Sequence, residues 1–207
     1  MESPTITIIA GPNGVGKTTF AQMIFSKEIE AGQFLNADQV AKELEESPGS
    51  NSLQGLAIQS GRKVIEQRRQ FIATRKSFIV ETTLASRSLA VALSTAKNNG
   101  FKIIFHYLWA STPNLCDFRV KDRVRKGGHN ISIDVITRRY YLGLQYFNNY
   151  FKISDEAYIY LSDFFPNLFM SKTDSSIDIK DEIIFDNFCN ELRSFVRNKL
   201  FSWITAP

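Results

Sequence analysis

Residues 6–25 read ITIIAGPNGVGKTTFAQMIF, in which an apolar run precedes a glycine-rich segment that ends in a lysine and two threonines. The central part fits the pattern G-x-x-x-x-G-K-[ST], which is typical of loops that bind nucleotide phosphates. The apolar run predicts a buried strand, and the residues from Lys17 to about Glu30 predict a helix. Because strand, loop and helix follow in the order that a phosphate-binding loop requires, the sequence predicts a nucleoside triphosphate site here.

Each residue type in this loop has a physical role. Backbone N–H groups of the loop and of the following helix converge on a phosphate, and glycine lets the chain turn tightly beside the phosphate oxygens. We expect Lys17 to reach the β- and γ-phosphates of ATP and the Thr18 hydroxyl to take one position on Mg²⁺. The residues predicted to bind the nucleotide are Gly11, Pro12, Asn13, Gly14, Val15, Gly16, Lys17, Thr18 and Thr19. The alternative is a glycine-rich turn with an incidental lysine.

Length and composition are those of an ordinary globular protein. The chain has 207 residues, of which 43% are hydrophobic and 22% charged, and this length suits one well-cored domain. The 17 phenylalanines are scattered along the chain, which indicates core packing. A net charge of +4 suits an anionic ligand such as a nucleotide but does not by itself indicate nucleic acid.

The cysteines and the apolar runs bear on the cellular location of the protein. Cys116 and Cys189 lie far apart without a metal-ligand spacing, so we predict two buried, reduced thiols. The first apolar run is short and lacks the basic lead of a signal peptide. No stretch approaches the roughly 20 uncharged apolar residues that a membrane span needs. We therefore expect a cytoplasmic protein without membrane association.

Strand-like and helix-like runs alternate along the chain. The expected strands are residues 5–11, 33–38, 77–83, 101–110, 156–161 and 166–171. The expected helices are residues 17–30, 39–46, 52–74, 86–100, 112–128, 132–151 and 178–204. This alternation predicts an α/β protein of the P-loop kinase-like, doubly wound type, with a mainly parallel sheet and helices on both faces. We expect one domain over residues 1–207, with a flap at about 119–139 and a C-terminal helical tail at about 178–204.

The phosphate loop alone does not select a reaction, since kinases, GTPases and ABC-type ATPases all use it. An ABC-type ATPase would also carry an LSGGQ-like signature and an apolar strand that closes in Asp-Glu. A GTPase would carry Asn-Lys-x-Asp. The sequence contains none of these, and its length leaves little room for a helicase or motor apparatus. A kinase that acts on a small molecule or on a polymer end is the prediction that remains.

Two carboxylates follow predicted strands, and ligands of a doubly wound sheet lie at such carboxyl ends. Asp38 is expected to accept the proton of the acceptor hydroxyl, because its short strand should lie beside the phosphate loop. Its alternative role is the N-cap of the next helix. Glu81 is expected to hold substrate hydroxyls or to act through water on Mg²⁺, or else to belong to a capped turn. The residues predicted to bind the substrate are Asn36, Glu81, Thr82, Thr83 and His129.

A basic segment surrounds two glycines. It contains Arg119, Lys121, Arg123, Arg125, Lys126, Gly127, Gly128, Arg138 and Arg139. We expect a mobile flap that closes on the nucleotide, excludes water and brings arginine to the charge growing on the transferred phosphoryl group. One alternative is a solvated helix face, paired in part with Asp117 and Asp122. Another is a nucleic-acid patch, which the lack of interleaved exposed aromatic residues disfavours. His129 either contacts substrate or caps the turn.

Taken in order, the motifs GPNGVGKTTFA, FLNAD, IVETTLASRS and RVKDRVRKGGHNISIDVITRRYYLGL resemble the zeta-toxin family of P-loop kinases. The similarity spans residues 5–150 and is strongest to the stand-alone bacterial branch often labelled predicted ABC-type ATPase. The resemblance implies an ATP-dependent phosphotransferase whose best-known members phosphorylate a sugar hydroxyl of UDP-N-acetylglucosamine.

The resemblance also assigns roles to single residues. Lys17 and Thr18 match the phosphate-loop lysine and the Mg²⁺-site hydroxyl. Asp38 matches the base, and Glu81 with Thr83 matches the pair that lines the sugar site. The flap arginines that grip the γ-phosphate correspond to Arg123 and to Arg138 or Arg139. The predicted catalytic residues are therefore Lys17, Asp38, Arg123, Arg138 and Arg139.

The expected activity is thus a Mg²⁺- and ATP-dependent kinase of a sugar nucleotide or a similar hydroxyl-bearing metabolite, with an antitoxin protein as its implied partner. One alternative is a kinase of another acceptor, such as an RNA end, a nucleoside or an antibiotic. Another is an NTP-binding regulatory ATPase. The tail from about residue 172 is either a docking surface for the partner or a closing helix, and its apolar stripe favours the closing helix.

Overall fold

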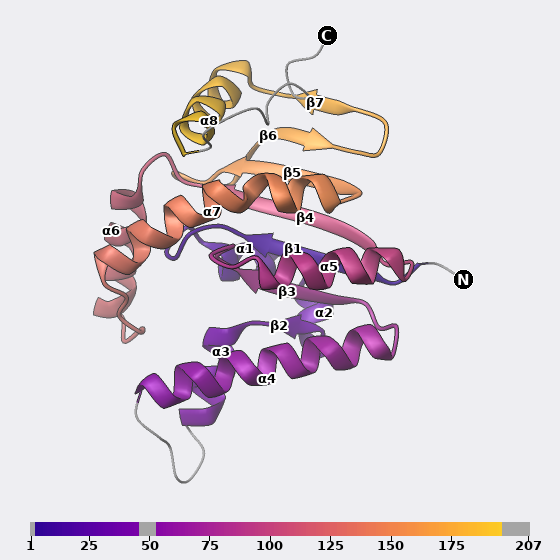
Figure 1. The fold of residues 1–207 in the computed structure, drawn as a ribbon. Helices are drawn as coiled ribbons and strands as arrows, with labels where there is room; N and C mark the ends of the chain where they lie inside the picture. Colours follow the sequence, from indigo (N-terminus) through magenta and orange to yellow (C-terminus); the bar gives the residue numbers. More distant parts are fainter. Residues whose placement is uncertain (1–2, 46–52, 196–207) are drawn as a thin grey trace.

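The computed structural model describes residues 3–45 and 53–195 (Figure 1). Within these ranges the strands are β1 Thr5–Ala10, β2 Phe34–Leu35, β3 Phe78–Thr82, β4 Lys102–Trp109, β5 Glu156–Leu161, β6 Asn167–Lys172 and β7 Ile177–Ile179. The helices are α1 Lys17–Ile24, α2 Ser26–Glu30, α3 Ala37–Glu45, α4 Leu53–Ala73, α5 Ser88–Asn98, α6 Pro113–Arg125, α7 Ile133–Ile153 and α8 Glu182–Phe195. All the strands of the described residues form one sheet in the order β2-β3-β1-β4-β5-β6-β7.

Most of the sheet is parallel. Strand β1 pairs in parallel with β3 and β4, β2 with β3, and β4 with β5. The central strand has Ile6, Ile8 and Ile9 fully buried, as expected for a strand covered by helices on both faces. The predicted mainly parallel α/β fold is therefore confirmed. The prediction of one domain over residues 1–207 extends beyond the described ranges and stays a prediction.

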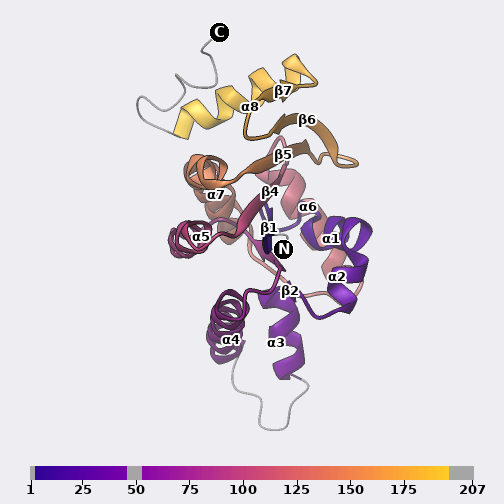
Figure 2. The same ribbon diagram turned by 90° about the vertical axis from the view of Figure 1, so that its right-hand side faces the viewer.

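Helices cover both faces of the sheet, as the alternating sequence pattern predicts (Figure 2). Helices α4, α5 and α7 lie on one face, over a large core that includes Phe105, Phe147 and Phe188. Helices α1, α2 and α6 lie on the other face, over a smaller core that contains Val15 and Phe20. The phosphate loop is therefore anchored in the smaller core.

Three predicted element boundaries are wrong. The strand expected over residues 33–38 is limited to Phe34–Leu35, and Asp38 belongs instead to α3, which begins at Ala37. The helix expected over residues 17–30 is interrupted at Phe25, whose φ of −125° and ψ of 34° are not helical. The Phe25 ring packs edge-on against His106 of β4 at 5.6 Å between centroids. Residues 178–180 were expected to begin the terminal helix, but β7 includes Asp178 and pairs antiparallel with β6. Helix α8 begins later because the Asp181 carboxylate caps it, accepting the Ile184 N–H at 3.0 Å. Residues 196–204 of the expected tail lie outside the described residues.

The position of β2 also differs from expectation. The strand that precedes Asp38 was predicted to lie beside the phosphate loop, but β3 lies there instead and β2 is the edge strand. Strand β2 has only two residues, whereas the first three residues of β3 are buried. The longer apolar strand therefore takes the inner position, and its carboxyl end brings Glu81 next to the loop.

The expectations for the cysteines are confirmed. Cys116 and Cys189 are both unpaired and buried, and burial raises the pKa of each thiol to about 11. Among the helices of the described residues, none has the length and apolar character required to cross a membrane.

Candidate active site

The phosphate loop connects β1 to α1 and is held by close backbone contacts. A Cβ on Gly11 would lie 2.3 Å from the Leu108 carbonyl oxygen, and a Cβ on Gly14 would lie 2.3 Å from the Cys116 carbonyl oxygen. Glycine is thus required where the loop packs against β4 and α6. Gly16, with a φ of 102°, faces open space instead. That open side lies at the N-terminus of α1, where backbone N–H groups favour an anion, so the loop fits a phosphate group.

Lys17 is buried at this loop, with 6% of its surface exposed. Its Nζ donates to the Pro12 carbonyl oxygen at 2.9 Å and lies 3.8 Å from a Glu81 carboxylate oxygen. Burial lowers the pKa of Lys17, whereas the charges of Glu81 and Asp38 raise it. A buried ammonium requires such partners, and the phosphates of a nucleotide would add further negative charge beside it.

Glu81 connects three parts of the site. One oxygen of its carboxylate, Oε2, accepts the Thr18 hydroxyl at 2.9 Å and the Asn36 side-chain amide at 2.7 Å. Burial raises the pKa of Glu81, and the charge of Lys17 opposes that shift. These bonds arise because residue 81 is directly opposite Ile9 in the β1–β3 pairing, one residue before β1 ends.

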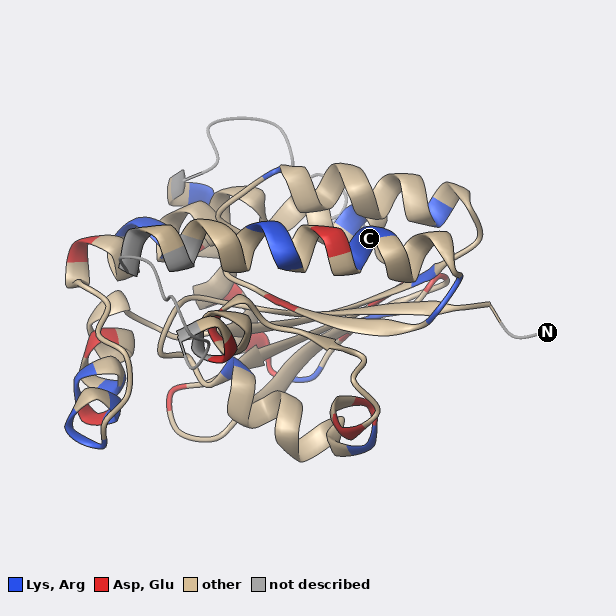
Figure 3. Cartoon of the chain, turned by 90° about the horizontal axis from the view of Figure 1, so that it is seen from below, with Lys and Arg blue, Asp and Glu red and all other residues tan. Residues whose placement is uncertain are grey.

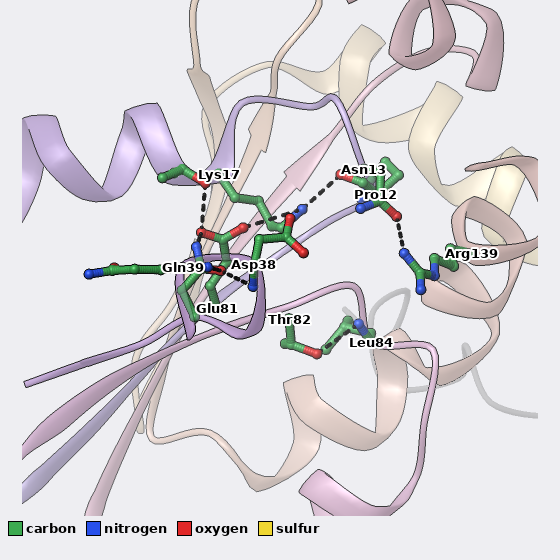
Figure 4. A network of polar contacts seen from close by, with 11 residues as sticks. Pro12, Asn13, Lys17, Asp38, Gln39, Glu81, Thr82, Leu84 and Arg139 are labelled. Carbon is green, nitrogen blue, oxygen red and sulfur yellow. Dashed lines mark hydrogen bonds and ion pairs between the residues drawn. The ribbon is translucent and has the colours of Figure 1, made fainter. Parts of the chain in front are cut away.

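Asn36, rather than Asp38, caps α3. The Asn36 side-chain oxygen accepts the N–H of Asp38 at 2.8 Å and the N–H of Gln39 at 3.3 Å, which is the usual role of an N-cap residue. The alternative of Asp38 as the cap is therefore wrong. Asp38 occupies the first turn of α3 and lines the same cavity as Lys17 and Glu81. Figure 4 shows these three side chains gathered on one side of the phosphate loop.

The predicted flap arginines occupy different environments. Arg139, from α7, donates to the Asn13 side-chain oxygen at 2.9 Å and so contacts the phosphate loop (Figure 4). Burial lowers the pKa of Arg139, and the charge of Asp38 opposes this. Arg123 lines the cavity and donates to the His129 carbonyl oxygen at 2.9 Å. In the described part of the chain, Arg138 makes no such contact with the loop, so the geometry favours Arg139 over its neighbour.

Part of the basic segment is a solvated helix face. Lys121 pairs with Asp117 at 2.6 Å and Lys126 pairs with Asp122 at 2.7 Å along α6. Figure 3 shows the basic and acidic residues alternating on this helix. These charges largely satisfy one another, as the charge pattern of the sequence allowed.

The remaining predicted substrate residues, Thr82, Thr83 and His129, are not among the described residues that line the cavity. The Thr82 hydroxyl accepts the Leu84 N–H at 3.1 Å, in a turn where the buried Leu84 has a φ of 56°. Such a conformation costs energy for a residue with a side chain, and the bond from Thr82 supports it. Helix α7 approaches the Thr83 carbonyl oxygen closely at Gly143. His129 is exposed and is not among the described residues that line the cavity.

One cavity of about 730 Å³ takes in Lys17, Asp38 and Glu81 on the open side of the phosphate loop. Of the predicted site residues, Asn36, Thr82, Thr83, His129, Arg138 and Arg139 are not among the described residues that line it. Its volume falls in the range of about 300–1,000 Å³ that is usual for small-molecule sites. It is lined by the phosphate loop, α1, Asp38, Glu81, α6 and the turn between β5 and β6. That turn contributes Ser162, Phe164, Phe165 and Pro166.

This last wall of the cavity was not predicted from the sequence. All phenylalanines were expected to serve core packing, but Phe164 and Phe165 are 91% and 85% exposed. The sequence signal that could have indicated this wall is an aromatic pair followed by proline between two predicted strands. Such a segment forms a turn, and turns lie at the protein surface.

The oxygen donors present fit a Mg²⁺ ion shared with phosphates. The Thr18 hydroxyl and the Glu81 carboxylate lie together, and Mg²⁺ is commonly held by one or two protein groups plus phosphate oxygens and water. Within residues 3–45 and 53–195 there is no cluster of three or more His, Cys, Asp or Glu side chains that could hold a metal alone. The remaining ligands of a Mg²⁺ ion at this position would come from the nucleotide phosphates and from water.

A buried lysine beside a glycine loop, between a parallel strand and a helix, defines a P-loop nucleotide-binding protein. The chain matches the family described as AAA domain over residues 6–142, and it belongs to that family. A Haemophilus influenzae protein described as uncharacterized is 32% identical over 131 residues, which make up 63% of this chain and 88% of that protein.

Solved structures share the fold at low sequence identity. A chain of the PezAT chromosomal toxin–antitoxin system of Streptococcus pneumoniae has a TM-score of 0.61 and 15% identity, with 96% of this chain and 89% of that chain covered. A chain of the AvrRxo1-ORF1:-ORF2 structure with ATP has a TM-score of 0.75 and 12% identity, with 95% and 66% covered. The P-loop kinase-like fold is thereby confirmed, in agreement with the zeta-toxin family that the sequence resembles.

Proposed function

We propose that this protein is an ATP-dependent phosphotransferase that transfers the γ-phosphoryl group to a hydroxyl of a sugar nucleotide. UDP-N-acetylglucosamine is the acceptor that the zeta-toxin resemblance implies. The observation that carries the proposal is the grouping of Lys17, Asp38 and Glu81 on the open side of the phosphate loop. Arg139 contacts the same loop through the Asn13 side chain. A nucleotide-binding switch needs the phosphate loop. It does not need a second carboxylate in the same cavity, such as Asp38, which does not cap a helix because Asn36 has that role.

In the proposed reaction, the oxygen of the acceptor hydroxyl forms a bond to the γ-phosphorus, and Asp38 accepts the proton that this hydroxyl loses. The bond between the γ-phosphorus and the β–γ bridging oxygen breaks, and ADP leaves with the electron pair. Lys17 holds the β- and γ-phosphates. Arg139, and Arg123 on closure of the segment around Gly127 and Gly128, balance the charge on the transferred group.

We assign Glu81 to the metal rather than to the sugar. Its bond to the Thr18 hydroxyl at 2.9 Å supports this role, because Thr18 is the residue that the P-loop pattern assigns to Mg²⁺. Bound there, Mg²⁺ would neutralise phosphate charge. Thr82 and Thr83 remain proposed contacts of the acceptor, at the turn that follows β3.

The test is transfer of labelled phosphate from ATP to UDP-N-acetylglucosamine and, in parallel, to a metabolite extract. Asp38→Asn should retain ATP affinity and lower transfer by about 10²-fold or more, because a positioned base contributes about 10²–10⁴-fold. Asp178→Asn, on the exposed β7 strand, is the matched control. Turnover of Asp38→Asn at the wild-type rate would remove Asp38 from the mechanism. Labelling of an RNA end, a nucleoside or an antibiotic instead would replace the sugar nucleotide as acceptor.

A protein partner of the antitoxin type and a cytoplasmic site of action belong to the same proposal. The likeness to a chain of a toxin–antitoxin system supports the partner, and the cytoplasm is where ATP and sugar nucleotides are available. Growth arrest on expression of the wild-type chain, absent with Asp38→Asn, is the expected result. Equal growth of both strains would contradict toxicity without affecting the transfer assay.

A further inference from the structure

Two neighbouring phenylalanines are exposed in the turn between β5 and β6. Phe164 and Phe165 are almost entirely accessible, whereas Phe169, just beyond them in β6, is fully buried. Isolated exposed apolar residues are normal at a protein surface, but an adjacent aromatic pair forms a surface suited to a ligand. Packing in the hydrophobic core is therefore not the role of Phe164 and Phe165.

The two phenylalanines line the same cavity as the phosphate loop. Met23 of α1, 70% exposed, and Pro166 line it as well, so the cavity combines apolar surface with the charged groups around Lys17. Figure 2 shows the β5–β6 connection on the side of the sheet that carries α1 and α6. A nucleoside triphosphate has the matching composition, with charged phosphates and a flat base.

Hydrogen bonds fix this turn to the phosphate loop. The Arg119 guanidinium donates to the carbonyl oxygens of Ser162 and Asp163, both at 2.6 Å. The Ser162 hydroxyl donates to the Val15 carbonyl oxygen at 2.9 Å, across 147 positions of sequence. The Asp163 carboxylate accepts the Ser111 N–H at 2.8 Å. The backbone beside the phenylalanines is thus held in a set position relative to the phosphate loop.

The same bonds limit how the turn can recognise a ligand. The polar side chains of Arg119, Ser162 and Asp163 are all engaged with backbone groups of the protein. What the turn presents to the cavity is therefore its aromatic and proline surface. Such a surface binds a planar base by stacking, which is available to every base because each has a π-face.

We propose that Phe164 and Phe165 form the platform on which the base of the bound nucleotide stacks. The proposal rests on the nucleotide-binding part of the proposed function, and it extends that part from the triphosphate to the base. It also gives Arg119 a different role from that of a flap arginine, since Arg119 is a positioning residue that holds the platform.

The experiment compares the binding of ATP and of inorganic tripolyphosphate to the full chain by calorimetry. Phe164→Ala, Phe165→Ala and the double variant should weaken ATP about 5- to 100-fold, the range that base–aromatic stacking supplies. They should leave tripolyphosphate within about twofold, because it has no base. Phe118→Ala is the matched control, since Phe118 is an exposed phenylalanine of α6 outside the cavity lining. It should change neither affinity.

Substitution by leucine separates stacking from simple apolar contact. Relative to the double alanine variant, the double leucine variant should recover less than half of the lost free energy of ATP binding. The double tryptophan variant should recover most of it. Unchanged ATP affinity in the double alanine variant, or an equal loss for tripolyphosphate, would overturn the proposal. Binding is measured without an acceptor, so a failure of phosphoryl transfer would count against the proposed kinase activity and leave this result standing.

Discussion

At the scale of single residues, Asn36 has two roles that its neighbours depend on. Its side-chain oxygen caps α3, which carries Asp38, and its side-chain amide holds Glu81. The sequence pattern N-x-D drew attention to both residues but left a capping role open for Asp38, because either Asn or Asp can cap a helix. Only the three-dimensional position of Glu81 shows why asparagine, which offers both an acceptor and a donor, suits residue 36.

This assignment predicts a difference between two substitutions of Asn36. Serine retains a capping oxygen but cannot supply the amide donor, whereas alanine loses both. Asn36→Ala should therefore have a free energy of unfolding about 1 kcal/mol lower than that of Asn36→Ser, which is the typical value of an N-cap. Urea denaturation of the two variants measures the difference directly. Equal stabilities would show that residue 36 does not cap α3.

His106 provides a pH-dependent prediction. Its ring stacks on Tyr158 at 5.1 Å, and burial lowers its pKa to about 4. The unfolded chain, with a histidine pKa near 6.5, binds a proton between these two values that the folded chain does not, so folding stability falls as the pH falls through this window. Above about pH 6.5 the histidine is neutral in both the folded and the unfolded chain, so none of this stability is lost there.

The variant His106→Phe retains an aromatic ring without the titration. From pH 7 to pH 4.5 the wild type should lose about 2–3 kcal/mol more of unfolding free energy than this variant. Carboxylates titrate in both chains, so denaturant titrations at the two pH values isolate the histidine. A parallel decline of wild type and variant would mean that His106 is not the group responsible.

At the scale of elements, tertiary pairing decides what local sequence leaves open. The strand β7 has only three residues, Ile177–Ile179, and all are exposed, so its alternation is too short to mark a strand beside the helical spacing that follows it. It exists because the edge of β6 offers hydrogen-bonding groups, with Ser171 opposite Asp178. The buried strands β1, β3 and β4 carried strong apolar runs, and for that reason the sequence predicted them well.

The β5–β6 turn yields a prediction about Arg119. Arg119→Ala removes two short bonds to carbonyl oxygens, and hydrogen bonds to charged groups contribute about 1.5–3 kcal/mol each. We expect the free energy of unfolding to fall by about 2 kcal/mol or more, and amide hydrogen exchange to increase in residues 162–165. Arg125→Ala, on the exposed side of the same helix, should change neither quantity. Normal exchange protection in the Arg119 variant would contradict its role as the anchor of the turn.

At the scale of the whole molecule, strand order determines which residues meet. Strand β3 separates β2 from β1, so Glu81 arrives from the neighbouring strand and Asp38 from a helix at the edge of the sheet. The sequence indicated both carboxylates and the phosphate loop but could not give this order, because parallel strands joined by helices can be arranged in several ways. The distances among Lys17, Glu81 and Asn36 follow from the order, not from any local motif.

The site draws on β1, α1, β3, α3, α6, α7 and the β5–β6 turn, so a bound nucleotide should stabilise the molecule as a unit. Ligand at about 100 times its dissociation constant adds about 2.7 kcal/mol, which corresponds to about 5–11 °C in Tm for a protein of this size. Thermal melting with ATP and Mg²⁺ should show this rise, and chelation of Mg²⁺ should reduce it. Lys17→Ala should show almost none of the rise, whatever its own Tm, because the shift is measured within one variant. A full rise in that variant would contradict binding of the triphosphate at this loop, because the Lys17 ammonium lies within the loop, where it contacts the Pro12 carbonyl oxygen and Glu81.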